Sequence, residues 1–98
     1  MQTIEIIAKE KRKYALNVDE DSFKRQDGKK YTKWEIEFEL YGQKNKIIGH
    51  GKFKTKSMTD NDFLSDDEIF NKLIEAGIKQ IKKSIENGDD IESVGYNF

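Results

Sequence analysis

The 98-residue chain contains no cysteine and only one histidine, His50. Without cysteine it has no disulfides, no thiolate metal sites and no thiol nucleophiles. One histidine cannot supply a two-histidine metal site, and its neighbours in Gly49-His50-Gly51 offer no nucleophile. We therefore expect no cofactor, no bound metal and no catalytic residues, and we predict that the protein is not an enzyme.

Long apolar runs are absent as well. No segment approaches the roughly 18 apolar residues of a membrane-spanning helix, and the first residues lack the basic-then-apolar order of a signal peptide. Glycine-rich phosphate loops and the G-x-S-x-G motif are missing too. We expect a cytoplasmic protein without membrane contact, and the length predicts a single domain over residues 1–98.

The net charge of −1 hides an uneven distribution. Residues 1–58 hold 14 Lys and Arg against 9 Asp and Glu, whereas residues 59–98 hold 4 Lys against 10 Asp and Glu. This split predicts either a basic binding face or two parts of one fold that attract each other. Richness in Lys, Ile, Asn and Asp, with only Arg12 and Arg25, is typical of AT-rich bacterial or phage coding sequences.

Strict alternation over residues 33–41 predicts a strand that is buried on one side. Residues 42–45 then form a turn, and residues 46–55 return as a second strand. The inward set is Trp34, Ile36, Phe38 and Leu40, and the outward set is Glu35, Glu37 and Glu39. Cross-strand chemistry predicts the pairs Trp34–Phe53, Leu40–Ile47, Glu35–Lys52 and Glu37–His50. In this register Ile36 and Phe38 face Gly51 and Gly49.

A second hairpin is predicted at the N-terminus. Apolar alternation there, with a three-residue loop at residues 10–12, predicts the pairs Ile6–Leu16 and Ile4–Val18. Residues 19–30 form the connection to the next strand. A two-residue turn at Asp27-Gly28 would place Leu16 opposite an outward glutamate, so we expect a bulge or an odd-length loop in this connection.

The acidic half begins with a polar connection and continues as a helix over residues 65–87. Ser65-Asp66-Asp67-Glu68 is a capping box, and Asn87-Gly88 provides the C-terminal cap. The helix stripe consists of Ile69, Phe70, Leu73, Ile74, Gly77, Ile78, Ile81 and Ile85. Gly77 suggests close helix–sheet contact over Gly49 and Gly51.

The predicted fold is therefore α+β. An antiparallel meander of about four strands occupies residues 1–58, and one long amphipathic helix packs on one of its faces. The tail at residues 92–98 alternates again and is either a fifth, edge strand or a flexible binding segment.

Two acidic clusters have the residue types of a catalytic or metal-binding site. Glu35, Glu37 and Glu39 lie about 6.6 Å apart by strand geometry, a spacing close to that of glycosidase acid pairs. A solvated strand face explains them more simply, because the chain is too small to surround them with a cleft. The run from Asp60 to Glu68 lacks the glycine and the final glutamate of a calcium loop, so it is interpreted as an acidic helix start.

The outer face of the sheet, opposite the helix, is the predicted contact surface, because apolar side chains lie there among lysines. The candidate partner-binding residues are Ile7, Tyr41, Ile48, His50, Lys52, Lys54, Tyr96 and Phe98. We predict a non-enzymatic protein-binding module, a small phage or mobile-element accessory protein that acts on a host or defence factor. An exposed strand edge makes homodimerisation an option.

The alternative is a DNA- or RNA-binding domain that uses the basic outer face. Three strands followed by a helix, with Gly51-Lys52-Phe53-Lys54-Thr55-Lys56 before the helix, form an arrangement similar in outline to the arm-type DNA-binding domains of phage integrases. The resemblance covers about half the chain and implies a sheet that contacts DNA through basic residues. Here Glu35, Glu37 and Glu39 occupy the corresponding face, and their charge opposes phosphate.

Overall fold

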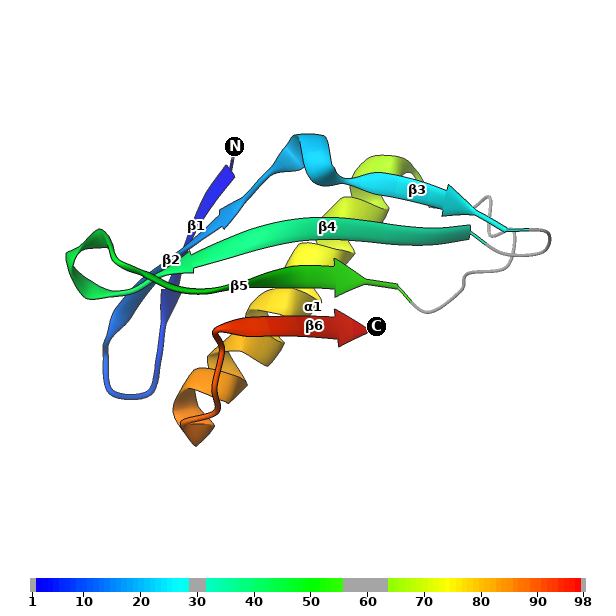
Figure 1. The fold of residues 1–98 in the computed structure, drawn as a ribbon. Coiled ribbons are helices and arrows are strands. Elements are labelled where there is room, and N and C mark those ends of the chain that lie inside the picture. The colour runs from blue at the N-terminus through cyan, green and yellow to red at the C-terminus, as the bar shows by residue number, and fades with distance from the viewer. Residues whose placement is uncertain (1, 29–31, 56–63, 98) are drawn as a thin grey trace.

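A six-stranded sheet with one helix across one face makes up the fold in the computed structural model, which describes residues 2–28, 32–55 and 64–97 (Figure 1). The strands are β1 (Gln2–Ile7), β2 (Lys13–Val18), β3 (Lys24–Asp27), β4 (Thr32–Tyr41), β5 (Ile47–Lys54) and β6 (Ser93–Asn97). The helices are the 3-10 turns η1 (Glu20–Ser22) and η2 (Gln43–Asn45) and the 22-residue α1 (Asp66–Asn87). The predicted α+β class is confirmed.

The strand order is β1-β2-β4-β5-β6, with β3 also pairing with β4. All pairs are antiparallel except β5 with β6, which are parallel because the chain returns through α1. The sheet therefore has two more strands than the predicted four. β3 lies in the stretch that was predicted to be a connection, and the 92–98 tail provides the edge strand β6.

A break between β2 and β3 shifts their pairing with β4 by an odd number of residues, and this is the irregularity that the sequence predicted. On β4, Leu40 faces Leu16 of β2, as required for a buried face, and Glu35 faces Lys24 of β3. The extra residues form η1, and the buried Ser22 fills the gap in the ladder. The Glu37 N–H donates to Ser22 Oγ at 2.9 Å, so β4 keeps a hydrogen bond at the position where neither β2 nor β3 pairs with it.

The predicted registers of both hairpins are wrong by two residues. β4 and β5 pair as Ile36–Phe53, Glu37–Lys52, Phe38–Gly51, Glu39–His50 and Leu40–Gly49. The N-terminal hairpin pairs Ile4 with Leu16 and Ile6 with Tyr14. Because side chains alternate with period two, a two-residue shift keeps each residue on its predicted face, except beyond the irregularity between Leu40 and Tyr41, where the β4–β5 ladder shifts by one residue. The turns caused the error: Lys11 and Lys44 adopt positive φ, which the sequence pattern does not reveal.

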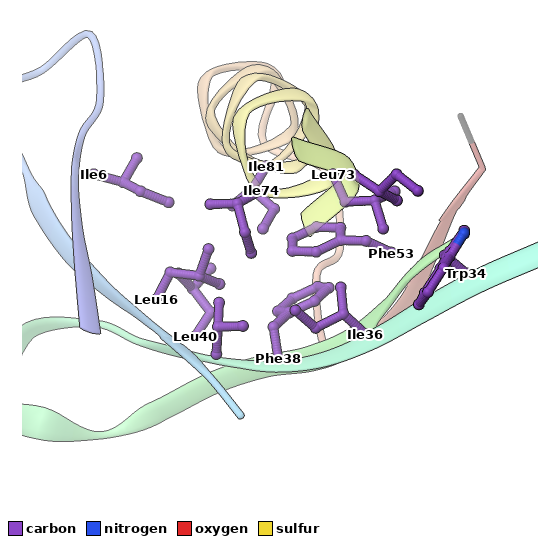
Figure 2. Close-up of a cluster of buried hydrophobic side chains, with 12 residues drawn as sticks. Ile6, Leu16, Trp34, Ile36, Phe38, Leu40, Phe53, Leu73, Ile74 and Ile81 are labelled. Carbon is purple, nitrogen blue, oxygen red and sulfur yellow. The ribbon is translucent and has the colours of Figure 1, made fainter. Parts of the chain in front are cut away.

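The core lies between the sheet and α1 (Figure 2). Inward residues of four strands meet the helix stripe, and the buried cluster comprises Ile6, Leu16, Val18, Trp34, Ile36, Phe38, Leu40, Phe53, Ile69, Leu73, Ile74 and Ile81. Helix α1 begins after Ser65, whose Oγ accepts the Glu68 N–H, and ends at Gly88 in the left-handed conformation. The helix predicted over residues 65–87 is thus confirmed.

Two glycines permit close approach, although not to each other. A side chain at Gly77 would collide with the ring of Phe53, and one at Gly49 would collide with the carbonyl of Ile91. The close helix–sheet contact predicted at Gly77 is confirmed, but it is made with Phe53, and the predicted contact with Gly49 is wrong. Gly77 admits an aromatic ring, and Gly49 lets the chain leave α1 and enter β6.

Candidate functional site

The outer face of the sheet is the side away from α1 (Figure 1). It presents the odd-numbered residues of β4 and their cross-strand neighbours. Trp34, Ile36 and Phe38 turn toward the helix, so Glu35, Glu37 and Glu39 turn outward. His50, Lys52 and Lys54 occupy the same face of β5 and are all exposed. The predicted outward placement of these three β5 residues is therefore correct.

Four apolar side chains lie toward one end of this face. Ala15 faces Tyr41, and Tyr41 faces Ile47, so these three form a row across β2, β4 and β5. Ile7 lies on β1 two residues beyond Glu5, which faces Ala15. Among the residues that the structure describes, Ile7 and Ile47 are the large apolar ones that stay exposed, at 50% and 54% of their surface. We call Ile7, Ala15, Tyr41 and Ile47 the outer apolar group.

The predicted outward position of Ile48 is wrong. The β4–β5 ladder shifts by one residue between Leu40 and Tyr41, and this bulge exchanges the faces of the two consecutive isoleucines. Ile48 is half-buried, packs against the core cluster and lies beneath Gly42, while Ile47 turns outward. Sequence reasoning missed Ile47 because a strand that alternates regularly gives no sign of a bulge.

Lysine and glutamate form a charge network beside the outer apolar group. Lys52 Nζ lies 3.1 Å from Glu35 Oε1 and 3.7 Å from Glu37 Oε1. The hydrogen bond to Glu35 is the main reason that the pKa of Lys52 is raised, so its ammonium stays protonated. Two of the three outer carboxylates are therefore already paired with this lysine.

The third carboxylate, that of Glu39, accepts a hydrogen bond from Tyr41. The Tyr41 hydroxyl donates to Glu39 Oε2 at 2.6 Å, and this bond to a carboxylate raises the pKa of the phenol above its usual 10.0. Nearby, the Thr3 hydroxyl donates to Asn17 Oδ1 at 2.9 Å. The Tyr41 ring is thus fixed in place within the outer apolar group by its own strand.

A shallow hollow of about 650 Å³ opens on the middle of the outer face. Its lining combines Phe38 and two glycines with charged or polar side chains, including Asp19, Glu37, His50, Lys52 and Lys54. His50 faces Glu39 across the ladder, so the predicted Glu37–His50 pair is wrong. Among residues 2–28, 32–55 and 64–97, none donates a hydrogen bond to the imidazole or accepts one from it.

Tyr96 of the tail does not join this surface. Tyr96 turns toward the core, where its ring lies 6.0 Å from Phe53 and 6.3 Å from Phe38, and its hydroxyl is 3.1 Å from Ser84 Oγ. The predicted role of Tyr96 as an exposed contact residue therefore conflicts with its packing. Phe98, the other predicted tail residue, lies outside the described residues.

The described residues form no metal site, and the comparisons with known proteins give no match that would indicate a function. Within the described part of the chain, no three side chains of His, Cys, Asp or Glu gather closely enough to hold a metal ion. No described helix is long and apolar enough to cross a membrane. A comparison with protein-family models finds no match, and neither curated proteins nor solved structures provide a significant one.

Proposed function

We propose that the protein is a non-enzymatic protein-binding module and that the outer apolar group is its contact surface. The observation that carries this proposal is the exposure of Ile7 and Ile47, at 50% and 54%, on the same face as Tyr41. Apolar side chains that cluster on an otherwise polar surface gain free energy when a partner removes them from water. Tyrosine is also enriched at the centres of protein interfaces.

The surroundings of the group resemble the polar rim of an interface. Lys13 Nζ lies 3.5 Å from Glu5 Oε1, and Arg12 Nε lies 3.2 Å from Glu10 Oε2 at the tip of the same hairpin. Both ion pairs are exposed, so they contribute little to folding. By register Glu5 stands opposite Ala15 and Lys13 opposite Ile7, so the first ion pair lies between these two apolar residues. Polar groups of both charges next to apolar ones suit a protein partner better than a uniformly charged surface does.

The same charges weigh against nucleic acid as the partner. Lys52 is shared by Glu35 and Glu37, and Glu39 stands beside them on the face that phosphate would approach. Phosphate binding needs lysines that can replace released counterions, whereas these carboxylates repel a polyanion. A gel-shift titration at ~50 mM salt is expected to show no binding of DNA or RNA; a steep salt-dependent shift would favour the alternative.

The proposal includes the statement that the protein is not an enzyme. The only histidine lies in an open hollow and faces a carboxylate, with no described nucleophile bonded to it. The setting that composition suggests, a phage or mobile-element protein acting on a host or defence factor, makes a bacterial lysate the natural source of the partner.

Affinity capture with matched variants tests the proposal. Wild-type protein, Ile47→Lys, Ile7→Lys and the helix-surface control Gln80→Lys are each immobilised and exposed to bacterial lysate. A protein retained by the wild type and by Gln80→Lys is then purified and titrated against all four. We expect at least a tenfold loss of affinity for each isoleucine variant, because a buried lysine would leave its charge unpaired in the interface. Equal binding by all variants, or no retained protein, overturns the proposal.

A further inference from the structure

Strand β6 lies at an edge of the sheet and contains no charged residue. It pairs with β5 alone and has the sequence Ser-Val-Gly-Tyr-Asn. The edge strand β3 consists of Lys-Arg-Gln-Asp, and the edge strand β1 carries Glu5. Charges on an edge strand oppose pairing with another strand. Of the three edges in the described sheet, β6 is therefore the least protected.

The backbone of Gly95 faces the open side of this edge. The His50 N–H donates to the Glu92 carbonyl at 3.3 Å, and His50 stands beside Ser93 in the ladder. In a parallel ladder each residue bonds to the two neighbours of its partner, so β6 uses the backbones of residues 92, 94 and 96 toward β5. The N–H and C=O groups of Ser93 and Gly95 therefore face away from β5.

Gly95 is also the middle residue of the strand and is open on its outer side. It is exposed, and a β-carbon at this position would meet no atom within 4 Å. Its register partner is Lys52, so a side chain at residue 95 would project from the outer face. Substitutions at residue 95 can thus place a charge at the centre of the edge without disturbing the core.

We propose that β6 pairs antiparallel with β6 of a second copy, about a twofold axis beside Gly95, and so joins two sheets into one. In this arrangement the two Gly95 residues exchange reciprocal N–H···O=C bonds, and residue 93 of each copy stands opposite residue 97 of the other. A second copy fits this edge because the outward backbone groups are symmetric about the strand centre and neither strand brings a charge. Five-residue strands bury less than the roughly 1,000 Å² of a stable interface, so the dimer is weak and depends on concentration.

Opposite charges at residue 95 test the twofold register. Sedimentation equilibrium over a hundredfold range of concentration is measured for the wild type, Gly95→Lys, Gly95→Glu, their equimolar mixture and the control Gln80→Lys. We expect dimerisation of the wild type and the control. Each Gly95 variant is expected to dissociate at least tenfold more readily, because like charges then stand directly opposite each other. The mixture is expected to associate at least as tightly as the wild type.

Three results would overturn the proposal. These are a wild type that stays monomeric at millimolar concentration, a Gly95→Lys variant that associates as the wild type does, or a mixture without recovered association. Urea unfolding of each variant verifies that the monomer remains folded, as the open space around residue 95 predicts. Ile47→Lys, which changes the outer apolar group instead, is expected to leave the dimer intact, so this proposal and the proposed function fail independently.

Discussion

Ser22 supplies a hydrogen bond to β4 at the break between β2 and β3. Its buried hydroxyl accepts the Glu37 N–H at 2.9 Å and donates to the Asp19 carbonyl at 2.7 Å. Ser22→Ala is expected to lower the free energy of unfolding by about 1–3 kcal/mol, because the N–H of β4 loses its partner inside the fold. Urea denaturation measures the change. The exposed Ser93→Ala is the control and should stay within about 0.5 kcal/mol of wild type; equal effects would contradict this role of Ser22.

The Tyr41–Glu39 hydrogen bond makes a prediction about pH. Because the bond to the carboxylate raises the folded-state pKa of Tyr41, its stabilising contribution is complete below the ordinary value of 10.0 and is lost as pH rises through the raised pKa. Absorbance titration near 295 nm, with Tyr41→Phe subtracted, should show ionisation above pH 10.0. In Glu39→Gln the midpoint should fall; an unchanged midpoint would show that the hydrogen bond does not hold the phenol.

The contact between α1 and β5 depends on the missing side chain at Gly77. Alanine usually stabilises a helix interior by about 1 kcal/mol over glycine. Here its methyl group would collide with the fully buried Phe53 ring, which stacks on Phe38 at 4.5 Å. Gly77→Ala is therefore expected to destabilise the fold by about 1–3 kcal/mol. Phe53→Leu should make room, so the double variant should lose less stability than the two single losses combined; simple additivity would contradict the contact.

The element boundaries could be predicted from the sequence where periodicity and caps are strong. Ser65, Gly88 and the isoleucine stripe define α1, and alternation defines the buried face of β4. The strand β3 was missed because Lys24–Asp27 is fully polar and is paired only on one side. The registers were missed because they depend on turns in which Lys11 and Lys44 adopt positive φ, and the sequence pattern does not indicate that conformation at a lysine. Of the candidate site, the outward residues of β4 and the β5 lysines were predictable, whereas Ile47 depended on an unforeseen bulge.

At the scale of the whole molecule, the sheet separates two surfaces of opposite character. One face is covered by α1, with Phe53, Ile74 and their neighbours buried between helix and sheet (Figure 2). The other face keeps its charges and the outer apolar group in water. A partner can therefore occupy the outer face without any rearrangement of the core. This division is the central claim on which the proposed function depends.

The consecutive residues Ile47 and Ile48 test that division most directly, because the bulge sends them to opposite faces. The measurement is the free energy of unfolding in urea for Ile47→Lys and Ile48→Lys. The account predicts that Ile47→Lys stays within about 0.5 kcal/mol of wild type. It predicts that Ile48→Lys loses about 2 kcal/mol or more, because an unpaired ammonium would be forced toward the core. Equal losses, or a larger loss for Ile47→Lys, would contradict the account.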